Sequence, residues 1–175
     1  LHHAVARVTE TGLPLLYLNL VGGQDELVFD GASFALGADR RLVAQAPWFE
    51  PALLLTSWSD EGDGFVPAGE RSMATPPETL EAIYRATVLG LRDYVAKNGF
   101  PGVVLGLSGG VDSGLSAAIA TDALGPERVH ALMMPSRYTA DESLEDARAS
   151  AELLGIQLDT VAIETAFEAL LGMLG

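Results

Sequence analysis

Eight consecutive residues, Gly106 to Ser113 (GLSGGVDS), combine chemical groups that can hold phosphate. They follow a short apolar run at residues 103–105 and precede an alanine-rich stretch at residues 115–123, which predicts a turn between a buried strand and a helix. In such a turn, adjacent glycines let the backbone approach a ligand closely, and the free N–H groups at the helix start point at an anion. The pattern therefore predicts a phosphate-binding loop. The alternative is a tight turn that needs glycine for its backbone angles and binds nothing.

The polar residues of this loop indicate a metal-assisted site. The loop lacks the Gly-Lys-Ser/Thr ending of a Walker A loop, and an aspartate stands in it instead. A carboxylate beside phosphates is repulsive unless a divalent cation bridges them, so Asp112 is predicted to be a Mg²⁺ ligand. Ser108 is a candidate donor to a phosphate oxygen, and Ser113 is expected to be the N-cap of the following helix.

The elements around the loop alternate between helix and strand. The patterns predict helices over residues 77–98, 113–124 and 141–154, and strands over residues 103–107, 129–134 and 157–163. This alternation implies a parallel sheet with right-handed crossovers, in which ligands bind outside the carboxyl ends of the strands. The loops after the first two strands should therefore flank one nucleotide. The predicted ATP-binding residues are Gly106, Leu107, Ser108, Gly109, Gly110, Val111, Asp112, Ser113 and Met134.

Two residues of the second loop allow alternative roles. Met134 either lines an adenosine pocket or packs in the core, since methionine commonly fills gaps there. Arg137 either meets a phosphate or lies in solvent at the surface, and the surface position is favoured.

The part of the chain before residue 59 is mostly β in pattern. A helix is predicted over residues 2–11, ended by Gly12. Residues 13–20 form a near-continuous apolar run typical of a strand buried on both faces, and shorter strand candidates are residues 26–29, 33–36, 41–46 and 52–58. The polar, glycine- and proline-rich residues 59–76 favour a surface linker over a regular element. We therefore expect a division into residues 1–58, a linker at 59–76, and residues 77–175.

The composition excludes several classes of protein. The 175 residues include no cysteine, so they hold no disulfide, no thiolate metal site and no cysteine nucleophile. No run approaches the roughly 20 apolar residues of a membrane span, and no signal-peptide pattern is visible, so a cytoplasmic location is expected. A formal net charge of −14 argues against a nucleic-acid partner, because such binding needs clustered Lys and Arg.

Two parts of the chain resemble known families. The loop Gly106–Ser113 is similar to the pyrophosphate loop of the N-type ATP pyrophosphatases, which adenylate a substrate and release pyrophosphate. Residues 13–33, with Asn19 at a strand end, then Gly22-Gly23 and the sequence FDGAS at 29–33, resemble the segment that follows the catalytic cysteine in nitrilase-type glutaminase domains. The pairing of the two, together with residues 134–139, resembles the glutamine-dependent NAD⁺ synthetase family over nearly the whole chain.

The resemblance implies a fold and a reaction. The expected fold class is α/β, with the β-rich C-terminal part of a nitrilase-like sandwich followed by the first part of a doubly wound parallel-sheet domain of the adenine-nucleotide α-hydrolase type. The expected reaction is ATP-dependent amidation of deamido-NAD⁺ to NAD⁺ with glutamine-derived ammonia, assisted by Mg²⁺, with release of AMP and pyrophosphate. Assembly into homo-oligomers is also implied.

The same resemblance implies what these residues lack. The family's cysteine, glutamate and lysine of glutamine hydrolysis have no counterpart in this sequence, so we expect no catalytic residue here and an internal part of a longer protein that does not turn over glutamine by itself. Two alternatives stay open: another pyrophosphate-loop ligase that forms an amide or thio product, and a non-catalytic ATP-binding module.

Overall fold

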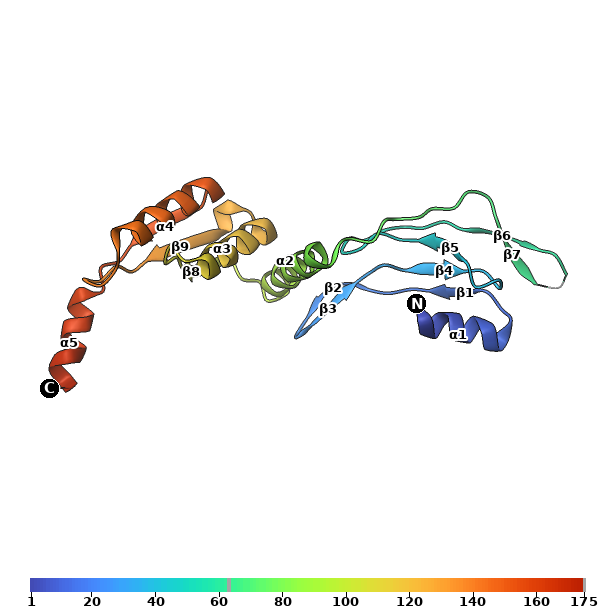
Figure 1. The fold of residues 1–175 in the computed structure, drawn as a ribbon, viewed down its shortest axis with the longest axis horizontal. Coiled ribbons are helices and arrows are strands. Elements are labelled where there is room, and N and C mark those ends of the chain that lie inside the picture. Colours follow the sequence, from blue (N-terminus) through green and yellow to red (C-terminus); the bar gives the residue numbers. More distant parts are fainter. Residues whose placement is uncertain (63, 175) are drawn as a thin grey trace. The chain divides into compact units, whose positions relative to one another are not determined.

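The computed structural model describes residues 1–62 and 64–174, arranged as two compact units, Leu1–Gly90 and Leu91–Gly175 (Figure 1). The boundary between the units falls inside helix α2 (Thr79–Lys97). The protein is of the α/β class, with antiparallel strands in the first unit and parallel strands in the second.

The first unit is built mainly from short antiparallel strands. Helix α1 (His2–Thr11) ends at Gly12, whose left-handed backbone (φ 68°) makes it the C-cap, as predicted. The strands form a three-stranded sheet in the order β1-β4-β5 and two hairpins, β2–β3 and β6–β7. Their bounds are β1 Leu15–Tyr17, β2 Val21–Gln24, β3 Leu27–Asp30, β4 Phe34–Leu36, β5 Leu42–Gln45, β6 Ser57–Asp60 and β7 Phe65–Ala68.

Two expectations for this unit were wrong. Residues 13–20 do not form one buried strand: β1 covers only Leu15–Tyr17, and Leu16 and Leu18 are 69% and 88% exposed. The reason is that β1 is an edge strand, hydrogen-bonded only to β4 among the described strands. The strand expected at residues 52–58 begins only at residue 57, as β6.

The segment 59–76 also contains regular structure that its composition did not indicate. Its glycine-rich start is the turn of the β6–β7 hairpin, where Gly62 and Gly64 adopt positive φ values of 85° and 144°. Farther on, the N–H of Gln45 donates to the oxygen of Ser72 (2.8 Å), and the N–H of Ala74 donates to the oxygen of Gln45 (3.0 Å). Residues 72–74 are therefore held against β5 and belong to the first unit.

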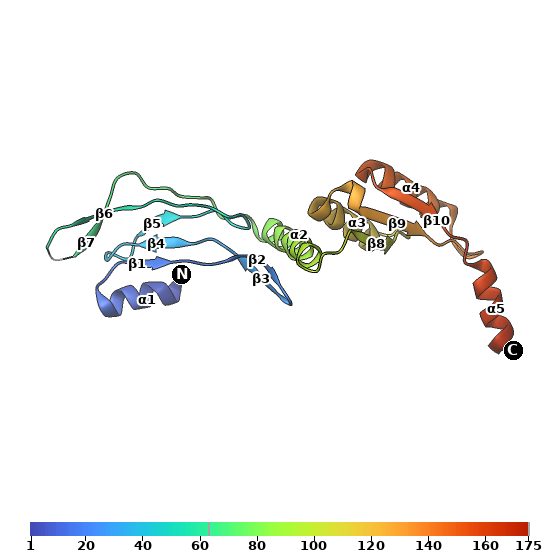
Figure 2. The ribbon, with the colours of Figure 1, turned by 180° about the vertical axis from the view of Figure 1, so that it is seen from behind.

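The second unit has the predicted alternation of strand and helix. Strands β8 (Val103–Gly106), β9 (Val129–Met133) and β10 (Gln157–Thr160) are parallel and ordered β10-β9-β8 (Figure 2). Helices α3 (Val111–Leu124) and α4 (Asp141–Leu154) connect them, and a short 3₁₀ helix, η1 (Pro126–Arg128), leads into β9. Helix α5 (Glu164–Leu174), which the sequence patterns did not indicate, follows β10.

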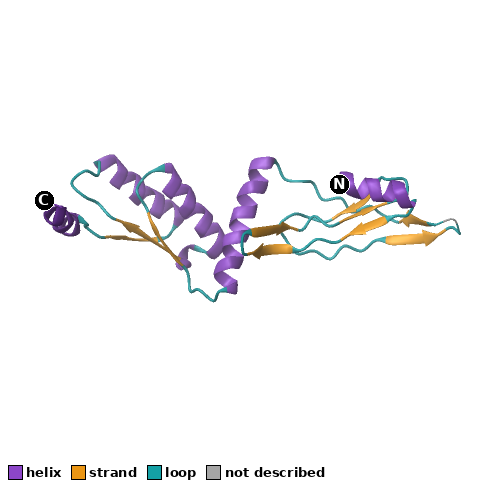
Figure 3. Cartoon of the chain, turned by 90° about the horizontal axis from the view of Figure 1, so that it is seen from below, coloured by secondary structure: helices purple, strands orange, loops and turns teal. Residues whose placement is uncertain are grey.

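Helices α3 and α4 pack beside each other on one face of these three strands (Figure 3). The residues of β9 that point to this face are buried, and most of the buried helix residues are alanines, whose short side chains let the helices lie close to the sheet. On the other face Val104 is 66% exposed. The described part of this unit therefore has helices packed on one face of its sheet. Among the described residues, no helix has the length and apolar character needed to cross a membrane.

Candidate nucleotide-binding site

The loop Gly106–Ser113 joins the carboxyl end of β8 to the start of α3, which confirms the predicted strand–turn–helix context. The N–H of Leu107 donates to the oxygen of Leu132 at 2.8 Å, so the loop is anchored to the central strand as it leaves the sheet. The Leu107 side chain is buried, whereas Val111 at the helix start is 82% exposed. Leu107 therefore anchors the loop in the core, and Val111 stands in solvent.

Gly109 is the loop residue that lies closest to helix α4. Its φ is +84°, and a Cβ placed on it would lie 2.2 Å from the backbone oxygen of Ser143, in the first turn of α4. At Gly110 the nearest atom to such a Cβ is the Ser108 hydroxyl at 3.5 Å, an ordinary contact. Glycine is therefore required at 109 both for the left-handed backbone and for the contact that brings the loop against α4.

The two serines of the loop bond to each other and to the loop backbone. The Ser113 hydroxyl accepts from the N–H of Ser108 (3.2 Å) and donates to the oxygen of Gly110 (2.9 Å). The Ser108 hydroxyl lies 3.0 Å from that of Ser113 and accepts from the N–H of Gly110 (3.3 Å). The predicted N-cap role of Ser113 is wrong: α3 begins at Val111 with Gly110 as N-cap, so Ser113 lies in the first turn and its hydroxyl reaches back to Gly110.

The sequence analysis placed Asp112 in the loop, but in the structure it is the second residue of α3. Its side chain is exposed, and within the described residues its carboxylate has no hydrogen bond or ion pair. A carboxylate in the first helical turn is stabilised by the helix dipole and lies beside the unbonded N–H groups of that turn.

No group of three or more His, Asp or Glu side chains that could hold a metal occurs among the residues described. Mg²⁺ in nucleotide sites is usually held by one or two carboxylates together with phosphate oxygens and waters. The free carboxylate of Asp112, beside a turn suited to phosphate, fits a cation that arrives with the nucleotide.

A cavity of about 210 Å³ lies next to the loop, at the carboxyl ends of β8 and β9. Four of the predicted residues line it, namely Gly106, Leu107, Ser108 and Met134, whereas residues 109–113 lie outside it. It is smaller than the roughly 300–1,000 Å³ of a pocket for a whole small-molecule ligand, and it is mostly apolar. The cavity therefore suits one apolar part of a nucleotide, such as a base.

Sequence reasoning missed several of the cavity's walls. Leu132, Met133, Thr139 and Leu144 also line it, as does Pro135, which belongs to the loop that was expected to flank the nucleotide. Met134 is 50% exposed, and its terminal methyl group reaches toward Gly106. A Cβ added to Gly106 would lie 3.4 Å from that methyl carbon. Met134 is therefore a wall of the cavity and not a core residue.

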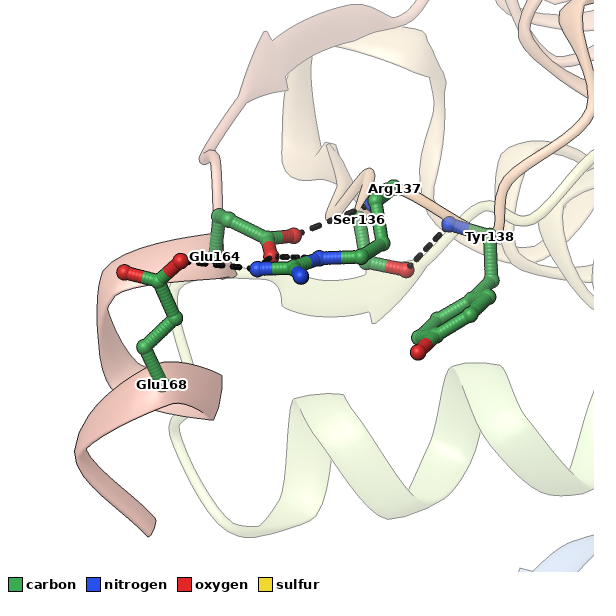
Figure 4. Close-up of polar contacts among 5 residues, drawn as sticks. All are labelled: Ser136, Arg137, Tyr138, Glu164 and Glu168. Carbon is green, nitrogen blue, oxygen red and sulfur yellow. Dashed lines mark hydrogen bonds and ion pairs between the residues drawn. The ribbon is translucent and has the colours of Figure 1, made fainter. Parts of the chain in front are cut away.

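The β9–α4 loop (residues 134–140) forms a compact turn. The N–H of Ser136 donates to the Thr139 hydroxyl (3.0 Å), and the N–H of Thr139 donates to the oxygen of Ser136 (3.0 Å). Arg137 lies at the surface of this turn and is ion-paired with Glu164 and Glu168 of α5 (Figure 4). The favoured surface position is confirmed, but the side chain is held by two carboxylates and is not simply solvated.

These ion pairs predict a pH-dependent stability. The pKa of Glu164 is lowered from its ordinary 4.5, chiefly by the side-chain hydrogen bond from Arg137 and next by the Arg137 N–H (3.0 Å). The pKa of Arg137 is raised by the same carboxylate. A lowered folded-state pKa means that the pairing stabilises above the unfolded-state pKa and is lost as pH falls through the folded-state value.

We therefore expect Glu164→Gln to lower the thermal unfolding midpoint only slightly at neutral pH, because exposed ion pairs contribute little to stability, and to lower it progressively less as the pH falls below 4.5. Unfolding followed by circular dichroism at several pH values checks this. A difference between the two proteins that stays constant down to strongly acid pH would contradict it.

The fold and this loop together define the class of protein. A parallel α/β sheet with a glycine-rich loop at the carboxyl end of its first strand, beside an apolar cavity, is a nucleotide-binding arrangement. The family model described as NAD synthase matches residues 83–174. The chain belongs to the NAD synthase family.

Known relatives match both units of the chain. It is 55% identical over 159 residues to the glutamine-dependent NAD(+) synthetase of Rhodobacter capsulatus, covering 91% of this chain and 29% of the relative. Its structure is similar to that of the glutamine-dependent NAD⁺ synthetase from Acinetobacter baumannii in complex with ADP, with a TM-score of 0.88, 38% identity, and coverage of 99% of this chain and 33% of that one.

A further solved structure matches a smaller part. The NH3-dependent NAD synthetase from Campylobacter jejuni, in complex with a nitrate ion, is 31% identical with a TM-score of 0.51, and covers 55% of this chain and 42% of that chain. The chain thus spans about a third or less of the glutamine-dependent relatives described above, at 29% and 33% of their lengths.

Proposed function

We propose that this chain is part of a glutamine-dependent NAD⁺ synthetase, a ligase that amidates deamido-NAD⁺ to NAD⁺ with ammonia released from glutamine. The observation that carries the proposal is a glutamine-dependent relative that is 55% identical over 91% of the chain. The phosphate-type loop at the carboxyl end of β8, with an apolar cavity beside it, supports the ATP-dependent step.

The proposed division of labour follows the two kinds of relative. Residues 1–58 are the C-terminal part of a nitrilase-like glutaminase domain, and 77–175 are the start of a doubly wound synthetase domain of the adenine-nucleotide α-hydrolase type. Residues 59–76 are a linker that folds onto the first unit through its hairpin and residues 72–74. In support, the glutamine-dependent neighbour covers 99% of this chain, whereas the NH3-dependent one covers 55%. The family model for NAD synthase begins only at residue 83.

In the proposed mechanism, residues 106–113 position the ATP phosphates. The backbone of the loop and the unbonded N–H groups at the start of α3 face the phosphate oxygens, and Met134 with its cavity takes the base of the adenosine. Mg²⁺ held by Asp112 would neutralise phosphate charge when bound. The other proposed partners are deamido-NAD⁺ and glutamine, without nucleic acid, in a cytoplasmic homo-oligomer.

The chemistry then runs through an activated carboxylate. An oxygen of the nicotinate carboxylate attacks the α-phosphorus of ATP, and the bond to pyrophosphate breaks. The nitrogen of ammonia attacks the resulting acyl adenylate, the bond to AMP breaks, and a proton is released. Alignment of the first attack is the task of the phosphate loop, because a fixed geometry replaces a costly encounter of free reactants.

The test is labelled-pyrophosphate exchange into ATP, measured with the complete protein of which we propose this chain to be a part. The exchange should depend on deamido-NAD⁺. Exchange that instead depends on xanthylate or on tRNA would indicate another pyrophosphate-loop ligase. ATP binding without any exchange would indicate a non-catalytic module.

A further inference from the structure

Several side chains join the β9–α4 loop to helix α5. None of them has a role in the mechanism proposed above. The Arg137 guanidinium hydrogen-bonds through Nε to Glu164 and through Nη2 to Glu168 Oε1 (2.7 Å), and the Arg137 N–H donates to Glu164 Oε2 (3.0 Å). Figure 4 shows the Arg137 side chain extended toward α5, between these two carboxylates, which lie one helical turn apart. Two carboxylates on one helix face thus hold a single arginine of the loop.

Further contacts reinforce this junction. The N–H of Ile163 donates to the oxygen of Pro135 (3.3 Å). The ring of Tyr138 meets that of Phe167 edge-on, with centroids 5.9 Å apart. Beyond Phe167, the side chains of Leu170, Leu171 and Met173 are 60%, 51% and 82% exposed. Within the described residues, Glu164, Glu168 and Phe167 of α5 therefore all contact the β9–α4 loop.

The same loop forms one wall of the nucleotide cavity. Met134, Pro135 and Thr139, on either side of Arg137, all line it. The hydrogen bonds between Ser136 and Thr139 make the turn compact, so that a displacement at Arg137 moves Thr139 as well. The place of this wall therefore depends on the contacts that Arg137 makes with α5.

We infer that Arg137 is a positioning residue for nucleotide binding, because its ion pairs with Glu164 and Glu168 hold the β9–α4 loop where Pro135 and Thr139 wall the cavity. The inference rests on the proposed ATP site. Exposed ion pairs contribute little to overall folding stability. The effect of losing Arg137 should therefore be on ligand affinity more than on folding. A planar guanidinium suits two carboxylates better than an ammonium does.

The experiment compares Arg137→Ala and Arg137→Lys with Arg148→Ala, which removes an exposed arginine of α4. In the complete protein, we expect Arg137→Ala to raise the Kd of Mg·ATP and the KM for ATP about tenfold, with a smaller change in kcat. This loss is below the roughly 10²-fold cost of a 1 Å misplacement, because the turn keeps its own hydrogen bond between Ser136 and Thr139. The Kd and KM of Arg137→Lys should lie between those of Arg137→Ala and wild type. Those of Arg148→Ala should equal the wild-type values. Calorimetry and steady-state kinetics provide the measurements.

A double-mutant cycle identifies the partner. If Glu164 acts through Arg137, Glu164→Gln should weaken ATP binding, and adding it to Arg137→Ala should have almost no further effect. Full additivity of the two changes would overturn the inference. The inference would also be overturned if the wild-type protein binds ATP and Arg137→Ala has the same Kd and KM for ATP as wild type. A wild-type protein that does not bind ATP would instead overturn the proposed function.

Discussion

Gly109→Ala should weaken Mg·ATP binding by at least about tenfold. The added Cβ would lie 2.2 Å from the backbone oxygen of Ser143, and a backbone atom cannot move aside as a flexible side chain can. A non-glycine residue at φ +84° adds strain of about 1–3 kcal/mol, and overpacking adds a similar amount. Since each 1.4 kcal/mol corresponds to about a tenfold change in affinity, even the lower part of this range gives the expected loss. Calorimetric titration with Mg·ATP measures it.

The matched control is Gly114→Ala, the same change five residues farther along the chain. Gly114 lies inside α3, and no atom lies within 4 Å of the Cβ that alanine would add. Alanine is favoured over glycine inside a helix by roughly 0.5–1 kcal/mol, so this variant should bind ATP like wild type and unfold no earlier. If Gly109→Ala lowered only the unfolding temperature and left ATP binding intact, the loop would be a structural turn and not a phosphate site.

Asp112→Asn is expected to lower kcat/KM for ATP by about 100-fold or more. Loss of outer-shell partners of a metal already reduces affinity or activity by about 10- to 100-fold, and a direct ligand should matter at least as much. Folding should change little, because the carboxylate is exposed and its interaction with the helix dipole is typically worth about 0.3–1 kcal/mol. Initial rates measured across a range of Mg²⁺ concentrations give both the loss and the weakened response to the metal.

Glu127→Gln is the control for removing a carboxylate. Glu127 is exposed in η1, which precedes β9 and so lies at the opposite end of the strands from the loop. It should leave the rate and its Mg²⁺ dependence unchanged. If Asp112→Asn kept both full activity and Mg²⁺-dependent ATP binding, the metal-ligand role would be wrong.

The order of elements in the second unit could be predicted because its signals are local. Apolar runs mark β8 and β9, and the C-cap of α4 is Gly155, whose φ is 67°. In the first unit the same reasoning failed at residues 13–20 and 52–58. Whether an apolar run is a buried strand depends on which strands lie beside it, and β1 has only β4 as a neighbour among the described strands.

Some features of the candidate site could likewise be predicted from the sequence, and others could not. The types and order of residues 106–113 by themselves determined the prediction of a phosphate loop with a metal-binding carboxylate, because glycine's backbone freedom and the chemistry of a carboxylate belong to single residues. Only the tertiary structure decided that Gly109 lies against Ser143 and that Arg137 pairs with Glu164. These contacts join residues far apart in the chain, and the order of the strands and the packing of α4 and α5 bring them together.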